Sequence, residues 1–284
     1  MLNGSSHTVA PGVDVVALRT PTLPPAEHTN CYLVGCSSIT VIDPGSPWED
    51  QRARLIEELM ARAAAGAHIE RILLSHRHHD HVAGTMALQG ELRARGWAVP
   101  IVAHPITTKW LQDDVEVNEA INDLDLLRCG ERTLRALWTP GHAPGHLAFH
   151  DEASDVMIAG DLVAAVGTIA IDPADGNLGD YLSSLQRIRA LRPSVLLPSH
   201  GPPIDDAVGT LDRYIAHRHM RSDQICAALP KHQPCGPEAL VPSVYPDLHP
   251  KAHALATAQI ESHLRWLVAE RRVEGSGDAY CLQS

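Results

Sequence analysis

A dense group of histidines and an aspartate follows an apolar segment, and this group constrains the chain more than any other feature. The apolar residues Ile72–Leu74 predict a buried strand, and the pattern His76-x-His78-x-Asp80-His81 begins directly beyond it. Residues two apart on an extended backbone point to the same side, so His76 and His78 can bind one ion together. Asp80 and His81 come where the next helix is predicted to begin. Imidazole and carboxylate groups at this density are the ligands that a zinc site requires.

Length and composition indicate an ordinary folded protein. The 284 residues suit one large domain, or a main domain of about 200 residues with a small companion. Hydrophobic residues make up 44% of the chain and charged residues 20%, which excludes a disordered chain. No run of about 18 apolar residues occurs, so we expect no transmembrane helix and no membrane partner. Met1–Val13 lacks the pattern of a signal peptide, and the six cysteines lack paired spacing, so we expect a cytoplasmic protein.

The net charge indicates which kind of partner the chain can bind. The chain carries 23 basic and 34 acidic residues, a formal net charge of −11. An acidic chain gains little from releasing counterions of nucleic acid, so such a partner would need a local basic patch. Aromatic residues make up only 4%, which disfavours a stacking surface for single strands. Composition therefore favours a small-molecule substrate, with single-stranded RNA as the alternative partner.

Apolar patterns predict alternating strands and helices in the first 200 residues. Strands are expected over residues 13–18, 31–34, 39–42, 99–103, 134–138, 147–150, 156–159 and 195–197. One helix is expected after the capping box Ser46–Glu49, a second over Val82–Arg95, and a third capped by Asp180. Residues 107–128 are polar and show no clear pattern. Strands that alternate with helices in this way indicate two sheets covered by helices.

The pattern changes after residue 204, where helical stripes replace short strands. The expected elements are a helix over residues 211–225, a break at Pro230 and at residues 234–237, a helix over 260–268 and a hairpin over 272–280. We therefore expect two domains, residues 1–204 and residues 205–284.

Three further segments place a metal-binding residue beside a strand or a turn. His142 lies on a Pro-Gly turn in the segment Thr-Pro-Gly-His-Ala-Pro-Gly-His, Asp161 follows an apolar strand, and His200 follows another. The order of these residues, His-x-His-x-Asp-His and then His, Asp and His, resembles the metallo-β-lactamase superfamily. The resemblance runs from about Thr29 to Gly201.

The resemblance implies both a fold and a set of ligands. The fold would be α+β, an αββα sandwich of two mixed β-sheets flanked by helices. Asp43 would support the ligand loop through hydrogen bonds, and His146 would be structural. Two Zn²⁺ ions are expected, and manganese or iron would suit the same ligands. The first ion would be held by His76, His78 and His142, the second by Asp80, His81 and His200, and Asp161 would bridge the two.

This ligand set predicts hydrolytic chemistry. Two adjacent divalent ions turn a bridging water into a hydroxide nucleophile near neutral pH. Asp161 would hold the ions together, and Asp80 would orient the nucleophile and move its proton. Asp80 and Asp161 are therefore the predicted catalytic residues of a zinc-dependent hydrolase.

The C-terminal part resembles the β-lactamase-like endoribonuclease branch of the superfamily, which adds a small, mostly helical winged-helix-like domain. The resemblance rests on Tyr214–Ile225, Val244–Tyr245 and Leu248–Pro250. It implies cleavage of RNA phosphodiesters, with Arg218 and Arg221 in the wall of a substrate cleft. The alternative for these two arginines is a solvated helix face that packs against the metal domain.

Two other functions are also compatible with the sequence. The Thr-Pro-Gly-His-Ala-Pro-Gly-His segment resembles that of hydroxyacylglutathione hydrolases, which implies hydrolysis of a small thioester, ester or lactone. The basic glutathione-binding segment of those enzymes is not found. A nucleic-acid-binding module with a structural zinc site is the non-enzymatic alternative. The full set of second-ion ligands disfavours that alternative, because a structural site needs only four ligands.

Overall fold

The computed structural model describes residues 6–111, 114–229 and 234–283. The chain divides into two compact units, which we describe separately. The first unit comprises residues 1–139, 145–169 and 192–207, and the second comprises residues 140–144, 170–191 and 208–284. The domain boundary between residues 204 and 205 stays a prediction. The break predicted at Pro230 lies outside the described residues.

A seven-stranded mixed sheet is the larger sheet of the first unit. Strands β1 to β4 pair antiparallel, and β4 to β7 pair parallel. Parallel neighbours need crossover connections, which here run through helices. The strands are β1 (His7–Ala10), β2 (Val13–Arg19), β3 (His28–Val34), β4 (Ser38–Ile42), β5 (His68–Leu73), β6 (Ile101–Ala103) and β7 (Glu119–Ala120). The helices are α1 (Glu49–Ala64), α2 (His79–Val82), α3 (Thr85–Ala94) and α4 (Pro105–Leu111).

A five-stranded sheet is the second sheet of this unit. Its neighbours pair antiparallel except for β11 and β12, which are parallel. The two mixed sheets with flanking helices confirm the predicted α+β class. In order, the strands are β12 (Val195–Pro198), β11 (Val156–Gly160), β10 (Leu147–Asp151), β9 (Arg132–Trp138) and β8 (Leu126–Cys129).

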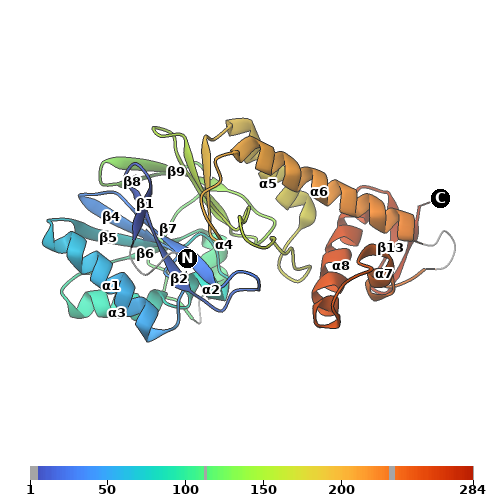
Figure 1. The fold of residues 1–284 in the computed structure, drawn as a ribbon, viewed down its shortest axis with the longest axis horizontal. Helices are drawn as coiled ribbons and strands as arrows, with labels where there is room; N and C mark the ends of the chain where they lie inside the picture. Colours follow the sequence, from blue (N-terminus) through green and yellow to red (C-terminus); the bar gives the residue numbers. More distant parts are fainter. Residues whose placement is uncertain (1–5, 112–113, 230–233, 284) are drawn as a thin grey trace. The chain divides into compact units, whose positions relative to one another are not determined.

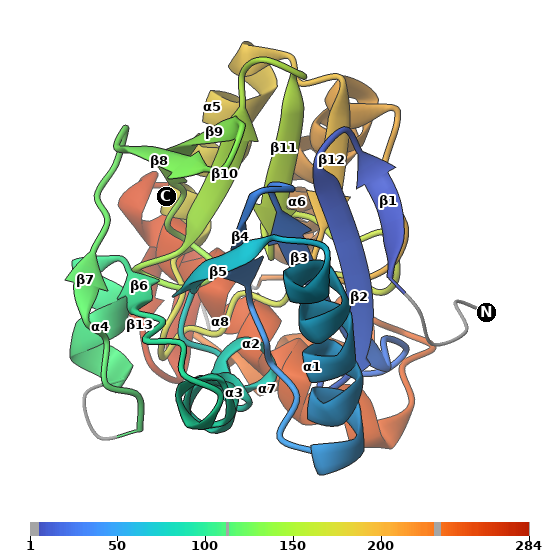
Figure 2. The same ribbon diagram turned by 90° about the vertical axis from the view of Figure 1, so that its left-hand side faces the viewer.

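Alternating side chains of the seven-stranded sheet supply two cores. Val15 of β2 belongs to a buried cluster with Phe149 of the other sheet, and the adjacent Val16 belongs to a cluster with Leu55 of α1. Neighbouring residues on a strand point to opposite faces, so one strand contributes to both clusters. Figures 1 and 2 show α1 and α3 on one face of this sheet and the five-stranded sheet on the other.

Two predicted helix starts are wrong. Helix α1 begins at Glu49, and Ser46 does not cap it; the Ser46 hydroxyl instead accepts a hydrogen bond from the Trp48 N–H at 3.3 Å. The helix predicted over residues 82–95 corresponds to α3, which begins at Thr85, and the short helix α2 precedes it. Gly84, between α2 and α3, lies close to the loop that contains Ser46, because a Cβ there would lie 2.3 Å and 2.5 Å from the carbonyl oxygens of Pro44 and Ser46.

The second unit is mostly helical. A buried cluster that includes Ile225, Leu264 and Tyr280 joins its last helices to the hairpin. Figure 1 shows helices α7 and α8 and strand β13 near the C-terminus. The predicted hairpin is present as β13 and β14. The elements are α5 (Leu178–Leu191), α6 (Ala207–Ala228), α7 (Pro237–Val244), the 3-10 helix η1 (Pro250–Ala252), α8 (His253–Ala269), β13 (Val273–Ser276) and β14 (Ala279–Leu282).

The start of α5 also differs from the prediction. The helix begins at Leu178, and the Asn177 side chain accepts a hydrogen bond from the Asp180 N–H at 3.0 Å, so Asp180 does not cap it. The adjacent Gly179 allows a close approach, because a Cβ there would lie 3.1 Å from Cδ1 of Trp266. The close packing of Trp266 against this position favours a small residue in the first turn of the helix.

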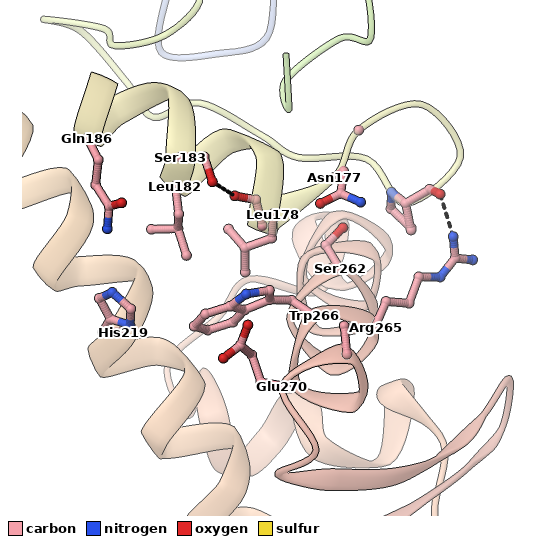
Figure 3. Close-up of a pocket in the computed structure, with 14 residues that line it drawn as sticks. Asn177, Leu178, Leu182, Ser183, Gln186, His219, Ser262, Arg265, Trp266 and Glu270 are labelled. Atoms are coloured by element: carbon pink, nitrogen blue, oxygen red, sulfur yellow. Dashed lines mark hydrogen bonds between the residues drawn. The ribbon is translucent and has the colours of Figure 1, made fainter. Parts of the chain in front are cut away.

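Helices α5, α6 and α8 border a groove with a volume of about 450 Å³ (Figure 3). Its apolar residues include Leu182 and Trp266, and the ring of Trp266 lies 5.5 Å from that of His219. Ser262, a buried polar residue of the groove, donates its hydroxyl to the Ile171 carbonyl at 2.5 Å. Gln186 is exposed to solvent. The groove is therefore a solvated seam between packed helices.

Across the described parts of the chain, no helix combines the length and apolar character needed to cross a membrane.

Replacing His263 of α8 by asparagine is expected to flatten the fall in stability at acid pH. Burial, and then Arg218 and Arg221, lower the pKa of His263 from 6.5 to about 3. Between these values the unfolded chain binds a proton that the folded chain does not, so stability falls as the pH falls through this window. The contribution is at most about 1.4 kcal/mol per pH unit. Urea unfolding of both proteins at several pH values measures it, and parallel curves would contradict the assignment.

Candidate metal centre

Six of the predicted ligands come together within the first unit. His76 and His78 lie in the loop after β5, Asp80 and His81 in α2, Asp161 directly after β11, and His200 after β12. His76, His81, Asp161 and His200 are buried, and His78 and Asp80 are partly buried. Two overlapping groups, each with ligand atoms within 4.8 Å of one another, are His76, His81 and Asp161, and Asp80, His81 and His200.

Nitrogen and carboxylate atoms face one another across this cluster. The Nε2 atom of His81 lies 3.6 Å from Oδ1 of Asp161 and 3.8 Å from Oδ2 of Asp80. The Nε2 atom of His200 lies 3.4 Å from the same Asp161 oxygen and 3.6 Å from the same Asp80 oxygen. The first turn of α2 and the ends of two neighbouring strands therefore present four ligand atoms to one small volume.

The surroundings of the two ring nitrogens of His81 indicate that the cluster fits a cation. Its Nδ1 donates to Oδ2 of Asp43 at 2.9 Å, which directs the lone pair of Nε2 toward Asp80 and Asp161. Nε2 is buried and has no hydrogen-bond partner among the described residues. A lone pair that faces two carboxylates is repulsive unless a proton or a cation lies between them. The residues present therefore fit a divalent cation.

The pKa shifts of the cluster histidines are consistent with a cation site. Burial lowers the pKa of His81, but Asp80, Asp161 and Asp43 outweigh it and raise the pKa well above its ordinary value. Burial also opposes protonation of His200, and Asp161 again raises the pKa. The carboxylates therefore favour a positive charge at these imidazoles, and a cation that binds there competes with protons.

Asp43 holds the ligand loop from the end of β4. It is buried and has a left-handed backbone, with φ of 53°. One carboxylate oxygen accepts from the Ser75 N–H at 2.8 Å, and the other accepts from the Ser75 hydroxyl at 2.5 Å and from His81. Such contacts fix the orientation and the tautomer of a ligating imidazole. The geometry is the one expected for the supporting role predicted for Asp43.

His146 lies beside the cluster and uses both ring nitrogens for hydrogen bonds. Nε2 accepts from the Asp161 N–H at 3.0 Å, so Nδ1 carries the proton and donates to the Thr139 hydroxyl at 2.8 Å. The preceding Gly160 has φ of 56°, and a Cβ there would lie 2.5 Å from the imidazole. The second histidine of the Pro-Gly-His repeat therefore anchors the backbone of Asp161.

His142 lies on the segment Pro140–Pro144, which belongs to the second unit. It is buried, and its Nδ1 donates to the Ala170 carbonyl at 2.8 Å. This bond leaves Nε2 as the nitrogen suited to a metal. Its role as a ligand beside His76 and His78 stays a prediction.

The two arginines of the predicted substrate cleft lie on α6. Arg218 is only 5% exposed, and its guanidinium lies 5.2 Å from the centre of the Tyr181 ring. Arg221 lies 4.1 Å from the Tyr245 ring and donates to the Val244 carbonyl at 2.6 Å. Arg218 is therefore buried against a neighbouring helix rather than solvated. A contact of either arginine with substrate stays a prediction.

Sequence reasoning missed two strand residues that contact this cluster. The Thr29 hydroxyl donates to Oδ2 of Asp80 at 3.5 Å and shares a hydrogen bond of 2.7 Å with Thr20. Asn30 contacts the loop that carries His200. No local signal marks either residue, because both contacts join segments far apart in the sequence.

The chain belongs to the metallo-β-lactamase superfamily. The model of this superfamily matches residues 24–200, and that of the β-lactamase-associated winged helix domain matches residues 237–280. Both confirm the family and the C-terminal domain type predicted from sequence.

Curated relatives are of the β-lactamase-like protein 2 type and the fungal lactamase-like type. The chain is 29% identical to the "Beta-lactamase-like protein 2 homolog" of Caenorhabditis elegans, over 78% of this chain and 72% of the relative. It is 30% identical to the "Lactamase-like protein adaB" of Aspergillus niger, over 72% of this chain and 59% of the relative. It is 30% identical to the "Atrochrysone carboxyl ACP thioesterase" of Claviceps purpurea, over 72% and 60%. The match thus spans about three fifths of these fungal relatives.

Solved structures show the same fold over nearly the whole chain. A β-lactamase domain protein from Burkholderia ambifaria has a TM-score of 0.85 at 23% identity and covers 99% of this chain and 94% of its own. A metallo-β-lactamase family protein from Thermus thermophilus has a TM-score of 0.79 at 23% identity and covers 97% and 100%. The protein is therefore a metallo-β-lactamase superfamily member with a cluster of histidines and aspartates capable of binding metal.

Proposed function

We propose that this protein is a hydrolase that uses two divalent cations, preferably zinc, to cleave a small acyl thioester. The observation that carries the proposal is the pair of ligand groups that share His81 within the first unit. A structural zinc site needs one set of four ligands, so two overlapping groups favour a catalytic centre. The ligands we assign are His76, His78 and His142 for one cation, Asp80, His81 and His200 for the other, and Asp161 for both.

The residues of the cluster would divide the chemistry as follows. When bound, the two cations supply hydroxide near neutral pH and polarise the scissile carbonyl. Asp80 lies at the partly exposed side of the cluster, where its carboxylate can take a proton from the attacking water and return it to the thiolate that leaves. The Thr29 hydroxyl lies 3.5 Å from one Asp80 oxygen, on the same side of the cluster. Buried Asp43 bonds the ring of His81, and buried His146 bonds the Asp161 N–H, so both ligands keep their orientation.

Two observations favour a thioester over RNA. A relative at 30% identity is named as a thioesterase. The net charge of −11 opposes a polyanionic substrate, since RNA binding depends strongly on phosphate neutralisation by basic residues. A small acyl thioester requires no extended basic surface.

RNA phosphodiester cleavage is the second candidate. It is favoured by the resemblance of the C-terminal part to the β-lactamase-like endoribonuclease branch. Arg218 and Arg221 are also held by aromatic rings, at 5.2 Å and 4.1 Å from the ring centres, and arginine suits a phosphate. A carboxylate on an acyl group would suit the same side chains.

The zinc-loaded full chain should release thiol from S-acyl-N-acetylcysteamine and leave labelled single-stranded RNA intact. Asp161→Ala, purified in parallel, controls for contaminating hydrolases. Thiol release is followed with a chromogenic disulfide, and RNA on a denaturing gel. RNA cleavage by the parent and not by the variant would replace the thioester with a phosphodiester. Inactivity toward both, with two cations bound, would overturn the thioester and the phosphodiester as substrates.

A further inference from the structure

The loop that carries His200 is attached to the opposite sheet. Pro198 ends β12 in the five-stranded sheet, and β3 belongs to the seven-stranded sheet. The Asn30 N–H donates to the Ser199 carbonyl at 2.8 Å, and Nδ1 of His200 donates to the His28 carbonyl at 2.9 Å. Because Nδ1 carries the proton for this bond, Nε2 keeps its lone pair for a cation. The position of β3 therefore determines the position of His200.

The side chain of Asn30 bonds both ends of this loop. Its Nδ2 donates to the carbonyl oxygens of Pro198 and Gly201, each at 2.8 Å. A primary amide has two N–H donors, so both are used on the loop. The residue is 6% exposed, and burial strengthens these bonds relative to water. The Tyr32 hydroxyl donates to the Pro198 carbonyl at 2.6 Å and accepts a longer bond of 3.3 Å from the same Asn30 Nδ2.

The backbone of the loop needs such support. Gly201 has φ of 93°, and a Cβ there would lie within 3.0 Å of the backbone of Val166 and the side chain of Ala165. The turn is thus tightly packed on one side. On the other side, the two bonds from Asn30 hold its first and last residues at a fixed separation.

We propose that Asn30 is the positioning residue for the second cation: by bonding Pro198 and Gly201 it holds Nε2 of His200 in place opposite Asp80 and Asp161. The assignment rests on the proposed two-cation function, in which His200 is a ligand. Asn30 is not among the ligands that we assign to either cation. Its effect is expected in the affinity for the second cation, because displacement of a ligating imidazole weakens binding even when the imidazole is still present.

Asn30→Asp tests the assignment with little change of shape. The variant replaces the NH₂ group by an oxygen that faces two carbonyl oxygens, which turns attraction into repulsion. Metal-free parent and variant, as full chains, are titrated with Co²⁺ and followed by calorimetry and by visible absorption of the bound ion. We expect about 10–100-fold weaker binding of the second cation, with the first cation bound as in the parent.

Two further variants make the result specific. Asn30→Ala removes both donors without repulsion, and it serves if the aspartate variant does not fold; the second cation should again bind more weakly. Asn118→Ala is the matched control. Asn118 also joins two segments, accepting from the Ile101 N–H at 2.8 Å and from Gln89 at 3.2 Å, but it has no bond to the His200 loop. This variant should bind both cations as the parent does.

The outcomes separate this inference from the function on which it rests. Two cations bound with parental affinities by folded Asn30→Asp and Asn30→Ala would overturn the role of Asn30 and leave the two-cation centre intact. A parent chain that binds fewer than two cations would overturn the proposed function, and the inference with it.

Discussion

Replacing Asp161 by alanine is expected to abolish hydrolysis by the zinc-loaded protein and to lower the number of bound cations. One oxygen of Asp161 lies 3.6 Å from Nε2 of His81 and 3.4 Å from Nε2 of His200. We assign this carboxylate to both cations, and without it the buried imidazoles face one carboxylate, that of Asp80. Changing a residue that only hydrogen-bonds a metal ligand lowers cation affinity roughly 10–100-fold. The loss of affinity in Asp161→Ala should be larger.

Metal content by elemental analysis and hydrolysis by thiol release measure this effect. Asp151→Ala is the matched control, because Asp151 is also a buried carboxylate of the five-stranded sheet, but it pairs with Arg132. The control is expected to lose stability and to keep both cations, since removing one partner of a buried pair destabilises the fold. Two tightly bound cations and parental hydrolysis in Asp161→Ala would show that Asp161 is not the bridging residue.

Replacing Gly45 by alanine is expected to lower the free energy of unfolding strongly, in contrast to the same replacement at Gly90. A Cβ on Gly45 would lie 1.8 Å from the carbonyl oxygen of Asp80 and 2.9 Å from Cα of His81. These atoms belong to the backbone of α2, so no side-chain rotation can relieve the overlap. The variant must displace α2 and both of its predicted ligands. We expect a loss on the order of 4 kcal/mol in the free energy of unfolding, together with loss of the second cation.

Gly90→Ala, in the same unit, is expected to change the stability in the opposite direction. Gly90 is an exposed interior residue of α3, and a Cβ there would meet no atom within 4 Å. Alanine is favoured over glycine in a helix by about 0.5–1 kcal/mol, so this variant should be slightly more stable than the parent. Urea unfolding of the three proteins gives the comparison. Equal midpoints for Gly45→Ala and the parent would contradict the close approach of the Asp43–Ser46 loop to α2.

Regular patterns along the chain predicted much of the fold correctly. The strand expected over residues 39–42 is β4 (Ser38–Ile42), and the strand expected over residues 147–150 is β10 (Leu147–Asp151). Alternation of side chains is a local property, so it survives in the folded protein wherever a strand has a buried face. The polar region 107–128 could not be assigned, because α4 and two short strands there have little apolar periodicity.

The wrong helix starts show where local rules failed. Ser46 satisfies the capping pattern, yet its backbone carbonyl lies against Gly84, between α2 and α3. Contacts between segments about 40 residues apart therefore outweighed a capping preference of about 1 kcal/mol.

The sequence by itself determined the chemistry of the cluster. His76, His78, Asp80 and His81 lie within six residues, so their proximity follows from chain connectivity alone. The tertiary structure alone decided what holds those ligands. Asp43 bonds Ser75 across 32 residues, and Asn30 bonds Pro198 across 168 residues. Such contacts depend on which strands become neighbours when two sheets pack, and packing is a property of the whole core that no local pattern records.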